Sequence, residues 1–222
     1  MRQRQRRDGY CKNEEGRRLY ARSTTILAKP AAIDAGIAYV RDSVMPELTA
    51  VDGCAGLSLV TDRLSGRTIV TSAWESMELM GASIAEAAQL RSHAGEVFGG
   101  EPVVDKWEIV MMHRAHAIPG SACCRISWGE AADVDVSVEK FKSEVMPLVE
   151  RAHGFCSASL FVNRLARRIC GTLTFDDRAT MEAQRELGDE RRMVITAMTG
   201  IYFNDVGEFD LVLAHLRVPE LV

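Results

Sequence analysis

The chain has 222 residues and a formal net charge of −4 at pH 7, with 47% hydrophobic and 26% charged residues. This composition is typical of a soluble globular protein. No run approaches the roughly 18 apolar residues of a membrane-spanning helix, so the sequence predicts no membrane partner. It also lacks the G-x-S-x-G, G-x-x-x-x-G-K-[ST] and H-E-x-x-H motifs, which disfavours a hydrolase, a nucleotide enzyme and a zinc protease.

Residues 1–22 form the first predicted segment, a basic tail. They hold eight Arg or Lys against three Asp or Glu, which leaves the rest of the chain acidic. No apolar segment follows, so the tail is not a secretory signal. We interpret it as a disordered start, with contact to nucleic acid or another acidic surface as the alternative. No aromatic residues beyond Tyr10 and Tyr20 are interleaved with the basic ones, so we predict no nucleic-acid partner.

Residues 23–116 read as strand, helix, strand, turn, strand, helix, strand. The predicted strands cover 23–29, 54–62, 67–75 and 103–113, and the middle two form a hairpin around Ser65-Gly66. The first helix shows apolar residues at helical spacing: Ile33, Ile37, Val40, Val44 and Leu48. Pro46 cannot donate a backbone hydrogen bond, so we expect that helix to kink or restart there.

The stretch Val44–Glu75 returns without a gap at Val145–Asp176, 101 residues later. Ten positions are identical in the two copies: Val44, Met45, Pro46, Gly53, Ser58, Leu59, Arg63, Leu64, Arg67 and Thr71 match Val145, Met146, Pro147, Gly154, Ser159, Leu160, Arg164, Leu165, Arg168 and Thr172. Such a period is a whole small domain rather than a solenoid unit. We therefore predict two repeats, 23–116 and 124–219, joined by a linker at 117–123. The last strand of the second repeat, Phe209–His215, matches the first repeat at an offset of 102 residues instead of 101.

The element order of each repeat, β-α-β-β-α-β, is that of the ferredoxin-like split βαβ arrangement, an α+β fold. Its antiparallel sheet carries helices on one face only. The bare face must be buried by something else, and the other repeat is the available cover.

The hairpin that ends in Thr71-Ser72-Ala73-Trp74-Glu75-Ser76, followed by a helix with Ser92-His93-Ala94-Gly95, resembles the antibiotic biosynthesis monooxygenase domain of the dimeric α+β barrel superfamily. The resemblance covers nearly all of each repeat. Members of that family usually pair two identical chains sheet to sheet. For this chain the resemblance implies the same barrel as a pseudo-dimer within one polypeptide, with a further homodimer left open.

The six cysteines form no C-x-x-C motif, and the two repeats share no cysteine position. The sequence therefore predicts neither a zinc site nor a disulfide framework, and reduced thiols fit a cytoplasmic location best.

His93 is the first candidate for chemistry. Heme-degrading relatives of the resembled family place an axial histidine on a similar helix, so the resemblance implies that His93 could ligate heme iron. An exposed helix histidine is the alternative. Without heme, we expect no cofactor and no metal.

His113 and His215 are duplicated, and each follows an alternating apolar row on the last strand of its repeat. Strand geometry would place them on the same sheet face as Trp107 and Phe209, facing a shared barrel interior. There an imidazole could act as acid or base near neutral pH. The alternative is a strand-end histidine in water.

Trp74, Trp107 and Trp128 lie on predicted strands and could form either the walls of a substrate cavity or ordinary core. Ser58 and Thr71, each duplicated, could donate hydrogen bonds to a bound oxygen function.

The resemblance implies a cofactor-independent monooxygenase acting on a small aromatic phenol or quinol in an apolar barrel cavity. His93, His113, Ser58 and Thr71 would be its catalytic residues, and the three tryptophans would contact substrate. The alternatives are a non-catalytic binding protein for a small hydrophobic ligand and a heme-binding or heme-degrading protein.

Overall fold

The computed structural model describes residues 18–216 and 221. In its first half the strands are β1 (Leu19–Leu27), β2 (Cys54–Thr61), β3 (Arg67–Trp74) and β4 (Val103–Arg114). The helices are α1 (Ile33–Tyr39), α2 (Met45–Thr49), α3 (Met77–Ala82) and α4 (Ile84–Phe98). None of the helices described is long and apolar enough to cross a membrane.

The second half follows the same order. Its strands are β5 (Cys123–Ala131), β6 (Phe155–Asn163), β7 (Arg168–Phe175) and β8 (Ile201–Leu216). Its helices are α5 (Val134–Lys140), α6 (Met146–Val149), α7 (Arg178–Ala183) and α8 (Arg185–Thr199). The predicted α+β fold with two ferredoxin-like units is therefore confirmed.

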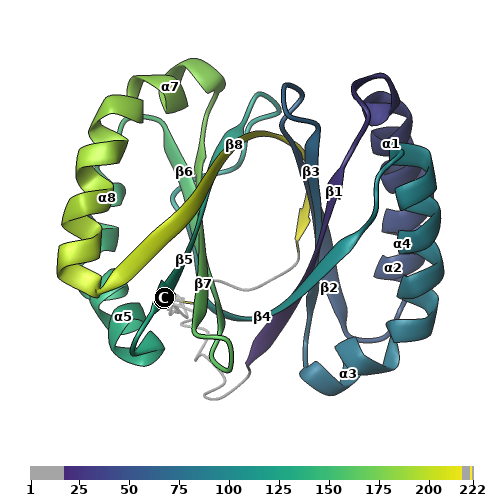
Figure 1. The fold of residues 1–222 in the computed structure, drawn as a ribbon, viewed down its shortest axis with the longest axis horizontal. Coiled ribbons are helices and arrows are strands. Elements are labelled where there is room, and N and C mark those ends of the chain that lie inside the picture. Colours follow the sequence, from purple (N-terminus) through teal and green to yellow (C-terminus); the bar gives the residue numbers. More distant parts are fainter. Residues whose placement is uncertain (1–17, 217–220, 222) are drawn as a thin grey trace, which may run out of the picture.

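The eight strands close into one antiparallel barrel in the order β1-β3-β2-β8-β5-β7-β6-β4. Each half contributes a four-stranded sheet, and the halves join where β2 pairs with β8 and β4 pairs with β6. The helices of the two halves cover opposite outer sides of the barrel, so that the sheet faces without helices meet in its middle (Figure 1). The barrel predicted for a single polypeptide is confirmed.

Two predicted boundaries were wrong. β1 begins at Leu19, so residues 19–22 belong to the first strand and not to the tail, while residues 1–17 lie outside the described part of the chain. Cys123 was placed in the linker but is the first residue of β5. Burial explains the N-terminal error, because Leu19 and Ala21 are core residues although basic residues surround them in sequence.

Pro46 interrupts the first helix as expected. A π-helical turn, Val40–Val44, precedes it, and α2 restarts with the proline in its first turn. The same arrangement recurs at Phe141–Val145 before α6. A π turn takes up the register change where the proline removes a backbone donor.

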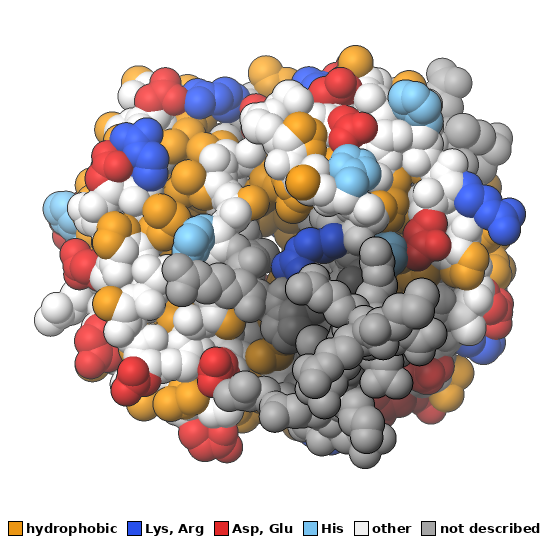
Figure 2. Space-filling model, turned by 180° about the vertical axis from the view of Figure 1, so that it is seen from behind, with side chains coloured by type: hydrophobic (Ala, Val, Ile, Leu, Met, Phe, Trp, Pro, Cys, Tyr) orange, Lys and Arg blue, Asp and Glu red, His pale blue; other side chains and the backbone are white. Residues whose placement is uncertain are grey.

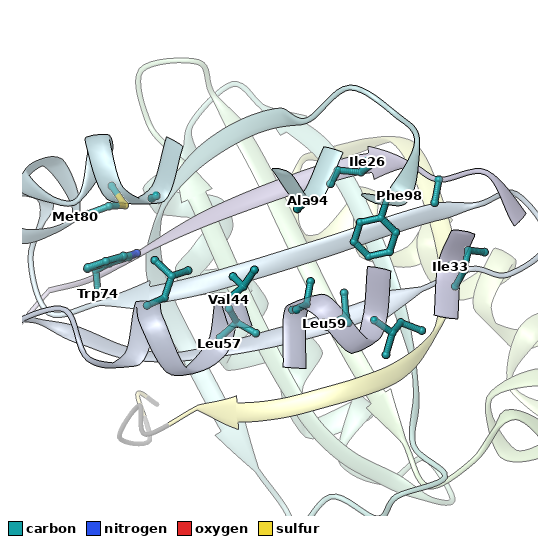
Figure 3. Packing of buried hydrophobic residues seen from close by; sticks show 14 residues of the cluster. Ile26, Ile33, Val44, Leu57, Leu59, Trp74, Met80, Ala94 and Phe98 are labelled. Atoms are coloured by element: carbon teal, nitrogen blue, oxygen red, sulfur yellow. The ribbon is translucent and has the colours of Figure 1, made fainter. Parts of the chain in front are cut away.

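The core lies in three layers: one between helices and sheet in each half, and one inside the barrel. Figure 3 shows the first, where Trp74 and Met80 pack at one end of the sheet and Phe98 and Ile33 at the other. Trp74 is fully buried on this helix-covered face, and its indole Nε1 donates to Ser72 Oγ at 2.9 Å. Trp74 is therefore a core residue and not part of the barrel interior.

Gly36 in α1 offers a test of this packing. A Cβ at this position would lie 2.1 Å from Cε1 of the buried Phe98 ring. We expect Gly36→Ala to lower the free energy of unfolding by about 1–3 kcal/mol, although alanine normally favours a helix. Gly81→Ala in α3 is the matched control, because its Cβ would meet no atom within 4 Å, and it should stabilise by up to about 1 kcal/mol. Urea denaturation measures both, and a stabilising Gly36→Ala would contradict the packing.

Candidate functional site

The largest cavity described lies inside the barrel and has a volume of about 170 Å³. Strands of both halves line it, and we call it the barrel cavity. Its walls are mainly apolar, with Ile109, Met112, Ile126, Phe161 and Leu211 among them. Seen from behind, the middle of the molecule is hollowed, and hydrophobic side chains and a basic side chain lie along the upper edge of the hollow (Figure 2).

Hydroxyl groups enter the barrel cavity in duplicated pairs. Ser58 on β2 and Thr71 on β3 are cross-strand partners, and Ser159 and Thr172 are partners in the second half. The structure thus brings together two of the four predicted catalytic residues, and their repeat mates with them. A hydroxyl can both donate and accept, so these groups could hold an oxygen function of a ligand from two sides.

The barrel cavity contains one ionised side chain among its described lining residues, Arg114 of β4. Sequence reasoning missed it, because Arg114 has no counterpart in the repeat alignment. Cys124 also lines the cavity, but burial raises its pKa, so it is a neutral thiol. Neither histidine, carboxylate nor tyrosine is present among the described lining residues, so the cavity offers a cation and hydroxyls but not a general base.

His113 and His215 do not face this cavity, contrary to the prediction. The ladder between β4 and β6 shifts between Ile109 and Met111, and that between β2 and β8 shifts at Leu59/Val60. Each shift is a β-bulge that turns the following residues of the long strand to the other face. Ile109 and Met112 therefore point into the barrel, whereas Met111 packs against the helices of the second half.

The two histidines consequently lie on the outer face of the barrel. His113 Nε2 is 3.1 Å from Glu150 Oε1, and its ring stacks on Phe155 with centroids 6.2 Å apart. His215 is exposed.

His93 is also remote from every cavity described. Its side chain is 57% exposed, pairs with Glu96 at 3.2 Å, and meets the ring of Tyr39 edge-on. The inner face of α4 is formed by Ala87, Ala94 and Phe98. His93 immediately precedes Ala94 and is rotated by about 100° from it, so it points outward.

Trp107 and Trp128 line a smaller cavity of about 40 Å³ that shares Thr71 and Thr172 with the barrel cavity. Arg67 of the first half covers the Trp128 ring at 4.1 Å and pairs with Asp205 at 2.8 Å. The arrangement recurs in the opposite sense, since Arg168 of the second half covers Trp107 at 5.0 Å and pairs with Asp105 at 2.6 Å. The two tryptophans thus form contacts between the halves.

Each half also contains a cavity between its helices and its sheet. The first helix–sheet cavity, about 30 Å³, is lined by Arg22 and Arg91, and the second, about 80 Å³, by Arg125 and Arg192. In the second half, Arg125 donates to Glu208 through Nη2 at 2.7 Å, and Arg185 binds the same carboxylate. Sequence reasoning missed this arginine pattern.

Three possible metal ligands meet beside the linker. Asp176 Oδ1 lies 3.1 Å from Cys156 Sγ and 3.5 Å from His116 Nε2. Nδ1 of His116 is 2.9 Å from the carbonyl of Ala117. Within this cluster the thiol and the imidazole each have the carboxylate as a partner, so their polar atoms are satisfied by one another.

These observations define the fold. It is an eight-stranded antiparallel α+β barrel formed by one chain, with helices on its outside and a cavity within.

The chain belongs to the same family as two Mycobacterium tuberculosis H37Rv proteins, Rv2557 and Rv2558, both described as uncharacterized. It is 48% identical to Rv2557 over 211 residues, which is 94% of each chain. It is 45% identical to Rv2558 over 207 residues, which is 92% of this chain and 88% of the other. No family model matches the sequence.

Solved structures of low sequence identity share the fold. An anthrone oxidase-like protein superposes with a TM-score of 0.64 and 13% identity, covering 93% of this chain and 96% of that one. A ferredoxin-fold protein from Listeria monocytogenes, related to antibiotic biosynthesis monooxygenases, superposes with a TM-score of 0.51 and 10% identity, covering 90% of this chain and 98% of that one. The heme-degrading enzyme LmHde, also from Listeria monocytogenes, superposes with a TM-score of 0.50 and 12% identity, covering 86% of this chain and 98% of that one.

Glu208 provides a pH-dependent test of the second helix–sheet cavity. Burial would raise the pKa of Glu208, but hydrogen bonds from Arg185 and Arg125 outweigh burial and hold it below its ordinary value. A carboxylate with a lowered pKa stabilises the fold above its unfolded pKa, about 4.3, and loses that contribution as the pH falls through the folded pKa.

We therefore expect Glu208→Gln to lower the free energy of unfolding at pH 7 by about 1.5–3 kcal/mol, because the charge-assisted hydrogen bonds to Arg125 are weakened. The gap between the variant and the unmodified chain should narrow as the pH falls below about 4.3 and should close only below the lowered folded pKa of Glu208. Exposed Glu144→Gln is the control. Urea titrations at pH 3 to 7 measure the difference, and a pH-independent gap would show that Glu208 is not an ionised partner.

Proposed function

We propose that the chain binds one small, mainly apolar compound with an oxygen function inside the barrel cavity. The observation that carries this proposal is the enclosure of duplicated hydroxyls by apolar walls at the junction of the two sheets. An apolar cavity of about 150 Å³ accommodates a benzene molecule. A volume of about 170 Å³ therefore favours a ligand with a single ring.

The charge of the cavity supports a phenol or quinol as the ligand class. Arg114 would favour a phenolate oxygen, and Ser58 or Ser159 would donate a hydrogen bond to an oxygen on the ring. A cationic ligand would meet no carboxylate among the described lining residues.

A second candidate function is oxygenation of the bound ligand in the same cavity. The anthrone oxidase-like neighbour and the neighbour related to antibiotic biosynthesis monooxygenases support it, together with the mainly apolar walls. The substrate anion would supply the electrons, and Arg114 and the hydroxyls would stabilise its negative charge. A quinol that gives two electrons and two protons to dioxygen yields quinone and hydrogen peroxide. Insertion of one oxygen atom into a ring C–H bond of the quinol, with release of the other as water, takes four electrons, all from the substrate, and yields a hydroxyquinone.

Heme is the least favoured ligand. One neighbour is a heme-degrading enzyme, but a porphyrin is far larger than either helix–sheet cavity, and His93 points away from both. Trp107 and Trp128 lie next to the barrel cavity, so their fluorescence should report ligand binding there.

Filling the barrel cavity tests the binding proposal. We expect single-ring phenols and quinols to quench tryptophan fluorescence saturably, and Ser58→Leu to weaken their binding at least tenfold by occupying the space. Ser92→Leu on the exposed surface of α4 is the matched control and should leave affinity unchanged. Equal binding by both variants would show that the ligand binds outside the barrel cavity.

Oxygen uptake with the same compounds tests the second candidate. Because the described cavity has no general base, we expect any uptake to rise with pH toward the phenol pKa, near 10 as for tyrosine, instead of following a group that titrates near 7. Peroxide assays separate two-electron oxidation from oxygen insertion. Saturable quenching without any oxygen uptake would leave the chain a binding protein.

A further inference from the structure

The buried arginines Arg22 and Arg125 occupy equivalent places on β1 and β5. Arg22 donates to the carbonyl of Met80 and, at 3.1 Å, to Ser83 Oγ at the end of α3. Arg125 donates to the carbonyl of Met181 at 3.2 Å at the end of α7. Each guanidinium therefore joins the sheet to the short helix of its own half and borders the helix–sheet cavity.

A second arginine lines each of these cavities from the long helix. Arg91 on α4 and Arg192 on α8 lie 101 positions apart, which is the offset of the repeat. Both halves thus place two guanidinium groups around one small cavity.

The two halves differ in the residue that faces the strand arginine from the neighbouring strand. Arg125 on β5 is opposite Glu208 on β8, and the carboxylate accepts from its Nε and Nη2 at 3.2 and 2.7 Å. Arg22 on β1 is opposite Lys106 on β4. The first half therefore has a third cation where the second half has the neutralising anion.

The first arginine pair lacks a compensating charge as a result. Arg22 is 3% exposed, and Arg91 Nη1 is buried without a hydrogen-bond partner among the described residues. Burial lowers the pKa of both groups, and the proximity of Arg91 lowers that of Arg22 further. A buried cation beside a half-buried one with an unused, buried donor is destabilising unless an anion is present.

We propose that the first helix–sheet cavity is an anion site in which Arg22 and Arg91 bind a carboxylate group, the role that Glu208 fills within the chain in the second half. Thr24 and Ser72 also line this cavity and add hydroxyls to the site. A volume of about 30 Å³ accommodates a formate-sized group and excludes an aromatic ring. The carboxylate belongs either to a free small anion or to the end of a larger ligand that parts the helices from the sheet.

This site is independent of the barrel cavity and of the function proposed for it. Thr71 points into the barrel, whereas the next residue, Ser72, faces the helices. Loss of phenol binding and loss of anion binding would therefore be separate results.

The test measures the melting temperature of the full chain against sodium formate, with ionic strength held constant by a bulky sulfonate salt. We expect a saturable rise of about 5–10 °C near one hundred times the dissociation constant. Arg91→Gln should abolish the rise, because it removes a cation and its unused donor. Arg192→Gln is the matched control in the second half and should retain the rise.

Lys106→Glu is the decisive variant. It places at the exposed position on β4 the carboxylate that the second half has at Glu208. We expect it to raise the melting temperature without formate and to remove the formate response. Benzoate serves as a second probe: a response to formate alone assigns a free small anion, and a stronger response to benzoate assigns the carboxylate of a larger ligand. The proposal is overturned if the response does not saturate or is the same in Lys106→Glu and Arg91→Gln as in the unmodified chain.

Discussion

The pairing of sheet edges between the two halves is the interaction on which the rest of this structure depends. A four-stranded ferredoxin-like sheet leaves one face bare and two edges with unpaired backbone groups. Joining β2 to β8 and β4 to β6 satisfies both edges and encloses both bare faces. The same pairing creates the barrel cavity, because the side chains of the two facing sheets do not fill the space between them completely.

Side chains reinforce this closure across the pseudo-twofold axis. Arg67 and Arg168 each reach into the other half, cover a tryptophan and pair with an aspartate. A planar guanidinium can stack on an indole while it donates to a carboxylate in its own plane, which lysine cannot do. The hairpin arginines, which are ordinary surface residues by sequence, are therefore part of the interface between the halves.

The two halves have the same fold but different electrostatics, and this difference separates the candidate sites. The barrel cavity is shared, mainly apolar and lined by symmetric hydroxyls and the Arg114 cation, which suits a small ligand held by packing and a few hydrogen bonds. The helix–sheet cavities belong to one half each. In the second half Glu208 binds the cavity-lining Arg125, and in the first half Lys106 stands at the equivalent position. Duplication supplied two copies of the arginine pair, and one copy was left without an internal anion.

The sequence by itself determined the repeat, the order of strands and helices and the location of Ser58 and Thr71 within apolar strands, whereas the closed barrel was implied by the family resemblance. Periodicity and an internal copy can be recognised along the chain without knowledge of its contacts. Only the tertiary structure decided which faces the histidines occupy, because a single-residue bulge in β4 and another in β8 reverse the alternation that period-two reasoning assumes. It also decided that Arg22 and Arg91, which are far apart in sequence, line the same cavity. Their repeat mates lie at different offsets, 103 for Arg22 and 101 for Arg91, so one alignment could not reveal them as a pair. Contacts of this kind depend on how the strands and helices pack against one another, and that packing cannot be derived from local sequence patterns.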